Sequence, residues 1–145
     1  MISRLNHVNV FVLDQDRAKA FYTESLGFEL RNDAMLDGFR WLTVGPQDQK
    51  DMSILLAYPA PPMFSPEDAE TVRALVAKGA LGGGVFETAD CQKTFEELSA
   101  KGVTFLQEPS KRPYGTEAVC RDNSGNWVVL VEQSEFTPED FASPA

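Results

Sequence analysis

The stretch Leu5–Phe28, LNHVNVFVLDQDRAKAFYTESLGF, sets the pattern for the rest of the chain. Its side chains first alternate between two faces, which predicts a strand. Asp14 then has the character of a helix N-cap, and apolar residues recur at helical spacing as far as Gly27, which is typical of the position just after a helix. A second strand is expected from Phe28. One face of the first strand carries His7, Asn9 and Phe11.

The same unit recurs in altered form in the second half of the chain. Leu81–Phe105, LGGGVFETADCQKTFEELSAKGVTF, again indicates a strand, a capped helix, a glycine and a new strand. His7 precedes Asp14 by seven residues, and Gly83 precedes Asp90 by seven. A repeat of this length predicts one supersecondary unit that is used twice, each copy burying an apolar face against the other.

Three strands are expected after the helix in each copy, because alternating or apolar runs there are separated by turn residues. In the first copy they lie at 28–32, 39–44 and 52–58, with a turn at 34–38. In the second they lie at 103–107, 116–121 and 127–133, with a polar loop at 108–115. The sequence therefore predicts an α+β fold built from two βαβββ modules.

The expected organisation is a single domain over residues 1–145. It comprises a first module at 5–58, a linker with a helix at 59–80, a second module at 81–133 and a tail at 134–145. Within the linker, Ser65 followed by Pro66 and two acidic residues predicts a helix start. Long connections often carry function, so this helix is either a plain connector or a cover for a ligand site.

Composition argues against several classes of partner. The net charge is −9, whereas nucleic-acid binding depends on Lys and Arg that neutralise phosphates. No run approaches the roughly 18–20 apolar residues that a membrane span needs, and the N-terminus lacks the pattern of a signal peptide. Cys91 and Cys120 are not a CxxC pair, so free thiols in a reducing compartment are expected. We expect a cytoplasmic protein without a nucleic-acid or membrane partner.

The opening segment HVNVFVLDQDRAKAFYTESLGF and the closing segment DNSGNWVVLVEQ resemble motifs of the vicinal oxygen chelate superfamily. That group includes glyoxalase I, extradiol dioxygenases, fosfomycin-resistance enzymes and bleomycin-binding resistance proteins. The resemblance covers residues 5–133 and implies two βαβββ modules whose sheets curl into an open, barrel-like cleft. It also implies a homodimer, and a metal site with ligands on equivalent strands of the two modules.

This chain departs from the ligand pattern that the resemblance implies. His7 occupies the first-strand position, but the fifth-strand position is Gly83, and the last-strand position, four residues beyond Gly125, is Val129. The fourth strand, 52–57, contains no Asp, Glu, His or Cys. The whole chain has a single His, whereas zinc and non-haem iron sites usually take three protein ligands. No cofactor is therefore predicted.

Two other roles for these polar residues stay open. A divalent metal could be held by a displaced set of His7 and Glu87, with Glu117 as a third ligand. His7 could instead be a structural residue or contact a ligand directly, because its pKa allows it to donate or accept near neutral pH. Cys91, at a helix start, could have a lowered pKa.

Without a metal, the expected cleft is defined by its aromatic walls and few polar groups, which suit a flat or amphipathic small molecule. Arg112 and Tyr114 could close over an anionic or aromatic ligand. We favour a metal-free small-molecule-binding protein. The alternatives are a metal-dependent lyase or dioxygenase, a metal-free acid–base enzyme, and an interaction protein without a site. The candidate ligand-binding residues are His7, Asn9, Phe11, Trp41, Val85, Glu87, Arg112, Tyr114, Trp127 and Val129.

Overall fold

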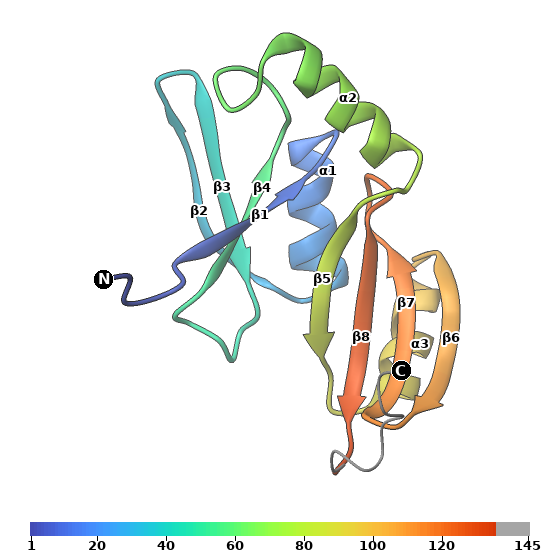
Figure 1. Ribbon diagram of the computed structural model, residues 1–145. Helices are drawn as coiled ribbons and strands as arrows, with labels where there is room; N and C mark the ends of the chain where they lie inside the picture. Colours follow the sequence, from blue (N-terminus) through green and yellow to red (C-terminus); the bar gives the residue numbers. More distant parts are fainter. Residues whose placement is uncertain (136–145) are drawn as a thin grey trace, which may run out of the picture. The chain divides into compact units, whose positions relative to one another are not determined.

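The computed structural model describes residues 1–135, and the predicted tail lies almost entirely outside them (Figure 1). The chain divides into two compact units, each treated by itself below. The first unit comprises residues 1–83 together with the short segment Asp122–Asn126. The second comprises Gly84–Arg121 and the chain from Trp127 onward. No helix among residues 1–135 is long and apolar enough to cross a membrane.

The first unit contains a four-stranded sheet, sheet 1, with the strand order β1-β4-β3-β2. β1 and β4 run parallel, and the other neighbours run antiparallel. The strands are β1 (His7–Phe11), β2 (Glu29–Leu36), β3 (Phe39–Gly45) and β4 (Ser53–Ala57). The helices are α1 (Gln15–Ala20), the π-helix η1 (Phe21–Ser25) and α2 (Pro66–Ala77).

The second unit contains sheet 2, also four-stranded, with the equivalent order β5-β8-β7-β6. One helix, α3, contacts β6, β7 and β8. The elements are β5 (Gly82–Glu87), α3 (Cys91–Ala100), β6 (Phe105–Arg112), β7 (Gly115–Arg121) and β8 (Trp127–Gln133). Two βαβββ modules with unclosed sheets are thus confirmed, and so is the α+β class.

The helix starts follow from their capping residues, which satisfy backbone N–H groups that have no partner within the helix. The Asp14 carboxylate accepts from the Arg17 N–H at 3.0 Å, and the Asp90 carboxylate accepts from the Lys93 N–H at 2.9 Å. The helix ends differ. The first helix finishes as a π-helix, in which the Leu26 N–H donates to the Phe21 carbonyl five residues earlier. A continuous α-helix was expected there.

Both outer hairpins are longer than the sequence predicts. β2 continues to Leu36, so the turn expected at 34–38 shrinks to Asp37 and Gly38, both with positive φ. β6 continues to Arg112, so most of the polar loop expected at 108–115 is strand. In both cases pairing with the neighbouring strand extends the strand through residues whose polar composition predicts a turn or loop. Pro109 is tolerated because β6 is an edge strand and its register shifts between Gln107 and Ser110.

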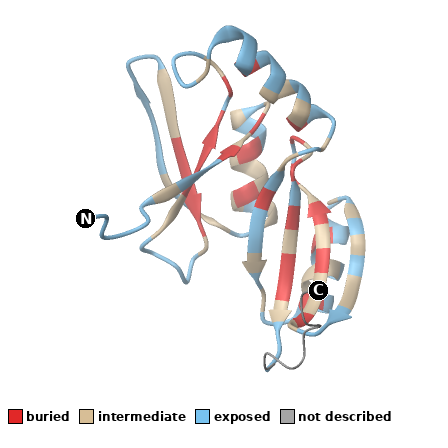
Figure 2. Cartoon of the chain, viewed as in Figure 1, coloured by how far each residue is buried: buried red, intermediate tan, exposed pale blue. Residues whose placement is uncertain are grey.

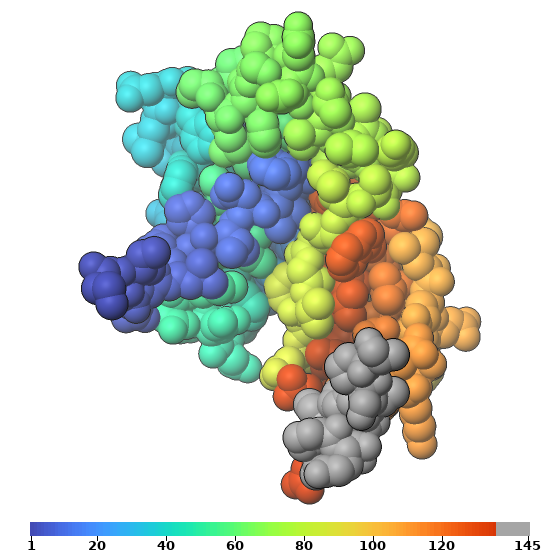
Figure 3. Space-filling model, in the orientation of Figure 1, coloured from blue at the N-terminus to red at the C-terminus, as the bar shows by residue number. Residues whose placement is uncertain are grey.

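The buried residues lie mostly in β3 and β4 of the first unit, in β7 and β8 of the second, and in the helices (Figure 2). In sheet 1 burial does not alternate along β3 and β4, because Thr43, Leu55 and Ala57 are buried as well as the residues that face α1. By contrast, the residues before β1 are exposed and project from the first unit (Figure 3). The α1-facing core positions are Val10, Val12, Leu42, Val44, Ile54 and Leu56.

The turn Asp122–Asn126 is bound into the first unit although its neighbours in sequence belong to the second. The Tyr22 hydroxyl donates to the Asp122 carboxylate at 2.8 Å. Asn126 Nδ2 donates to the Phe11 carbonyl at 2.8 Å. Gly125 is required here, because its φ is +111° and a Cβ would lie 3.0 Å from the Val76 carbonyl oxygen. The end of β1 therefore depends on a turn more than one hundred residues away.

Candidate functional site

One face of sheet 1 points away from α1. Strand register places residues of four strands on this face, because directly paired residues point to the same side. His7, for example, pairs with Ser53, and Thr43 pairs with both Leu55 and Asn32. We call it the open face of sheet 1. It comprises His7, Asn9, Phe11, Glu29, Asn32, Ala34, Leu36, Phe39, Trp41, Thr43, Gly45, Ser53, Leu55 and Ala57.

Aromatic rings gather on the open face of sheet 1. The rings of His7 and Trp41 meet edge to face, with centroids 5.2 Å apart and planes at 80°. Trp41 also lies 6.2 Å from the Phe39 ring. Phe11 meets the ring of Phe64, a linker residue, with centroids 5.2 Å apart. All these separations lie in the range of favourable aromatic pairs. The face thus offers flat apolar surfaces together with a few hydrogen-bonding groups.

The polar groups of this face are, with one exception, neutral amides, hydroxyls and one imidazole. His7 Nδ1 lies 2.9 Å from the Asn6 side-chain oxygen, which leaves Nε2 as its other polar atom. Asn32 Nδ2 donates to the Thr43 hydroxyl at 3.2 Å. Asn9 is exposed between His7 and Phe11 on β1. Among the side chains that define the open face of sheet 1, Glu29 is the one charged group; it lies at the end near Gly45 and pairs with Arg31 and Lys50.

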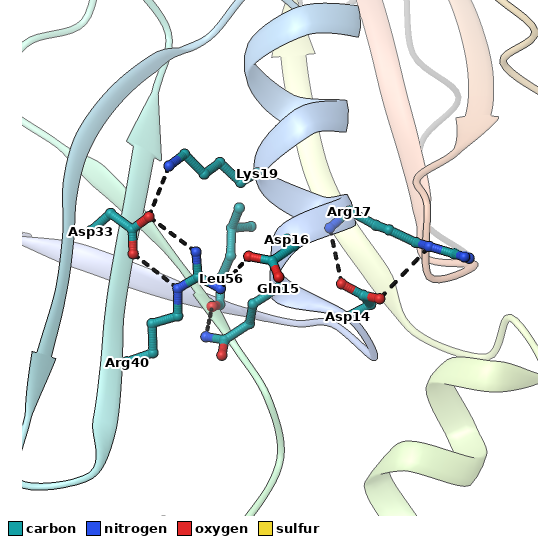
Figure 4. Close-up of polar contacts among 8 residues, drawn as sticks. All are labelled: Asp14, Gln15, Asp16, Arg17, Lys19, Asp33, Arg40 and Leu56. Atoms are coloured by element: carbon teal, nitrogen blue, oxygen red, sulfur yellow. Dashed lines mark hydrogen bonds and ion pairs between the residues drawn. The ribbon is translucent and has the colours of Figure 1, made fainter.

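Asp33 and Arg40 of sheet 1 lie on the α1 side (Figure 4). Arg40 Nε donates to Asp33 at 2.9 Å, and its Nη1 donates to Asp16 of α1 at 2.7 Å. Lys19 of α1 also donates to Asp33, at 2.9 Å. The hydrogen bonds from Arg40 and then Lys19 hold the pKa of Asp33 well below its ordinary value, and the hydrogen bonds that Arg40 donates to Asp33 and Asp16 raise the pKa of Arg40. These four charges neutralise one another.

A charged group borders the open face only at the end near Gly45. There Arg31 is so close that a Cβ on Gly45 would lie 2.6 Å from its Nη2. The guanidinium donates to backbone carbonyls of the loop after β3, including that of Pro46 at 2.8 Å, and pairs with Glu29 at 3.1 Å. The guanidinium of Arg31 therefore binds Glu29 and the loop after β3 rather than a ligand.

The face of sheet 2 that points away from α3 carries different kinds of side chain. The Thr88 and Thr94 hydroxyls lie 2.6 Å apart, which directs Thr88 toward α3 and hence Val85 and Glu87 to the other side. Val85 is 64% exposed and Trp127 is 39% exposed. The open face of sheet 2 comprises Val85, Glu87, Gln107, Ser110, Arg112, Gly115, Glu117, Val119, Arg121, Trp127, Val129, Val131 and Gln133. It carries carboxylate and guanidinium groups on several strands, whereas the open face of sheet 1 has one carboxylate, Glu29, at its end near Gly45.

Arg112 and Tyr114, expected to close over a ligand, are bound to Glu117 instead. The Tyr114 hydroxyl donates to the Glu117 carboxylate, and this hydrogen bond raises the pKa of Tyr114. Arg112 Nε lies 3.7 Å from the same carboxylate, and Arg112 Nη2 donates to Gln107 at 3.1 Å. The result is a polar cluster on the β6–β7 hairpin, in which Glu117 accepts hydrogen bonds from Tyr114 and Gln107 and pairs with Arg112, so that it is not a free metal ligand.

The side chains at the family's ligand positions do not fit a metal ion. Val129, at the last-strand position, pairs with Val119 across β7. Glu132 lies on the opposite side, where it accepts from the Cys91 N–H at 2.9 Å. No group of three His, Cys, Asp or Glu side chains suited to a metal occurs within residues 1–135. We therefore derive no chemistry through a metal.

Cys91 is also unsuited to nucleophilic chemistry. Its thiol is fully buried, and burial first and then the nearby Glu132 raise its pKa. The lowered pKa expected at a helix start is therefore wrong, because desolvation and a carboxylate outweigh the helix dipole. Cys120 is a second buried free thiol.

The candidate residues thus divide between the two units. His7, Asn9, Phe11 and Trp41 share the open face of sheet 1, while Val85, Glu87, Arg112, Tyr114, Trp127 and Val129 belong to the second unit. Sequence reasoning missed Phe39 and Phe64. The alternation of FRWLTV could have added Phe39, since it shares the parity of Trp41. Phe64 follows a proline-rich segment and gives no local signal.

Comparisons with known proteins agree with this architecture. Residues 4–130 match the family model of the Glyoxalase/Bleomycin resistance protein/Dioxygenase superfamily. The uncharacterized protein YurT of Bacillus subtilis (strain 168) is 40% identical over 126 residues, which are 86% of this chain and 95% of YurT. The crystal structure of UcmS2 is 52% identical, covers 92% of this chain and 100% of its own, and has a TM-score of 0.86.

A further solved structure is that of a binding protein. TnmS3, an antibiotic binding protein from Streptomyces sp. CB03234, is 32% identical, with 92% of this chain and 98% of TnmS3 covered and a TM-score of 0.73. The resemblance noted in the sequence is therefore confirmed over nearly the whole chain. The chain belongs to the Glyoxalase/Bleomycin resistance protein/Dioxygenase superfamily.

Proposed function

We propose that this protein binds a small, uncharged aromatic or amphipathic molecule on the open face of sheet 1, without a metal. The observation that carries the proposal is the combination of His7, Trp41 and Phe39 rings on a face whose one charged residue, Glu29, is ion-paired at the end near Gly45. Ligand sites are typically aromatic and apolar surfaces with a few well-placed polar groups. Asn9 and His7 are the groups that fix the ligand's orientation.

Two further findings support this proposal over an enzyme. TnmS3, which has the same fold and is 32% identical, is an antibiotic binding protein. His7 contacts the Asn6 amide and the Trp41 ring, and neither is an ionisable group that could act with it in acid–base or metal chemistry. Glu117 is engaged by Tyr114 and Arg112.

The test uses two fluorescent probes that share one ring system. N-phenyl-1-naphthylamine is neutral, and 8-anilinonaphthalene-1-sulfonate carries an anionic sulfonate. We expect saturable 1:1 binding of the neutral probe, weaker binding of the sulfonate, and no change when EDTA is added. Loss of binding in EDTA would contradict the metal-free site, and stronger binding of the sulfonate would contradict the preference for an uncharged ligand.

We also infer that the protein works as a cytoplasmic homodimer. Two buried free thiols suit a reducing compartment, and the dimer follows from the family resemblance. Light scattering tests the assembly: a homodimer has twice the 16.0 kDa mass of the chain. A species of 16.0 kDa at working concentration would contradict the homodimer.

A further inference from the structure

The linker contributes an aromatic ring to the open face of sheet 1. Phe64 belongs to the segment between β4 and α2, outside both sheets. Its ring nevertheless lies 5.2 Å from that of Phe11, with the planes at 66°. Phe64 is only half-buried, so part of its ring is accessible beside the residues that we assign to ligand binding.

The backbone around Phe64 is held in place by several contacts. The Phe64 N–H donates to the Ala60 carbonyl at 3.2 Å. Arg73 of α2 donates to the Pro59 carbonyl at 2.7 Å, and its guanidinium lies 5.5 Å from the centre of the Tyr58 ring. These contacts fix the backbone of the linker and with it the position of Phe64.

A purely structural explanation for Phe64 is available and must be separated from a binding role. Phe64 immediately precedes Ser65, the N-cap of α2, whose hydroxyl accepts from the Asp68 N–H at 3.1 Å. A hydrophobic residue at that position often packs against the fifth residue beyond it, here the buried Ala69. Leucine would serve such a contact as well as phenylalanine does, whereas an aromatic ligand distinguishes the two.

We propose that Phe64 is a specificity-determining residue that contacts the ligand and, with Phe11, selects for a planar aromatic group. This inference rests on the function proposed above. The ring pair Phe11–Phe64 forms one side of the binding surface, supplied by the linker rather than by either sheet. The linker is then part of the binding site and not a plain connector.

The experiment compares three variants by titration with N-phenyl-1-naphthylamine and by thermal unfolding. Phe64→Leu should weaken binding of the probe about three- to tenfold, the range expected for loss of an aromatic contact. Phe64→Tyr keeps the ring and should bind as the unsubstituted protein does. Phe28→Leu is the matched control, because Phe28 contacts Tyr22 and is not among the residues of the open face.

The outcomes separate the two proposals. If Phe64→Leu binds the probe as the unsubstituted protein does, the role of Phe64 is refuted while the binding face survives. If Phe64→Leu and Phe28→Leu weaken binding alike, in step with lowered melting temperatures, Phe64 is structural. If the unsubstituted protein shows no saturable binding, the proposed function fails, and this inference fails with it.

Discussion

The two sheets share one topology, yet their open faces differ in chemistry. In sheet 1 the face carries aromatic rings and neutral polar groups, and its charged neighbours are paired on the α1 side or directed at loop carbonyls. In sheet 2 the equivalent face carries Glu117, which binds Tyr114 and Arg112. A duplicated module thus keeps its backbone pattern while the residues pointing away from the helix diverge. The first face is the one on which we propose that an uncharged aromatic ligand binds.

The largest expected effect comes from removing the single Trp of each face. Trp41→Ala should weaken binding of N-phenyl-1-naphthylamine by about thirtyfold or more, as truncation of a central aromatic commonly costs about 2 kcal/mol or more. Trp127→Ala, the matched change in sheet 2, should alter the affinity less than about twofold. The measurement is a fluorescence titration. Equal losses of probe affinity in the two variants would contradict the proposed difference in function between the two faces.

The second prediction concerns the anchoring of sheet 1 by the turn Asp122–Asn126. Tyr22→Phe deletes the hydroxyl that donates to the buried Asp122. Leaving a buried acceptor without this donor should lower the free energy of unfolding by about 1–3 kcal/mol. Urea denaturation followed by circular dichroism measures the loss. Phe28→Tyr, which adds a hydroxyl beside Tyr22, is a control for generic changes at this cluster, and an unchanged urea midpoint for Tyr22→Phe would contradict the anchoring role.

The third prediction adds a charge to β1 on the open face of sheet 1. Asn9→Asp is nearly isosteric at an exposed position, so the fold should be retained. The new carboxylate must lose water when a neutral aromatic binds beside it, and the affinity for N-phenyl-1-naphthylamine should fall about three- to tenfold. Glu87→Gln, which removes a charge from the open face of sheet 2, should leave the affinity unchanged. An effect of Glu87→Gln as large as that of Asn9→Asp would refute the contrast.

The smallest effect is expected on the α1 side of sheet 1. Asp33→Asn removes a carboxylate whose folded-state pKa lies below its ordinary value of 3.8, so its stabilisation is present above pH 3.8 and is lost as the pH falls toward the folded pKa. The variant should melt about 2–4 °C lower at pH 7, and the difference should shrink below pH 3.8. Probe affinity should not change. A constant difference in melting temperature across this pH range would contradict the ion-pair explanation.

Much of the fold could be predicted from the sequence because its signals are local. Asp14 and Asp90 cap helices in the structure as their positions indicate, and the repeat between the two halves matches two sheets of equivalent strand order. The ends of β2 and β6 could not be predicted, because long hairpins gain hydrogen bonds from a partner strand that composition does not reveal. The π-helix at Phe21–Ser25 is a further feature without a local signal.

The candidate site was predicted in part. Strand alternation grouped His7, Asn9 and Phe11 on one face, and in the structure the predicted Trp41 lies beside them, in ring contact with His7. The contacts that Arg112 and Tyr114 make with Glu117 had no signal in the sequence. Side-chain pairing of this kind depends on the β6–β7 register, which includes two irregularities that no periodic pattern indicates.

The sequence by itself determined the module repeat, the helix caps and the presence of Gly83 and Val129 at the family's ligand positions, since each depends on residue identity and spacing. Only the tertiary structure decided where Phe64 lies, which charges are neutralised and how the turn Asp122–Asn126 holds β1. These are contacts between residues distant in the chain. They form because buried or closely packed groups must find partners, and the fold rather than the local sequence brings those partners within reach.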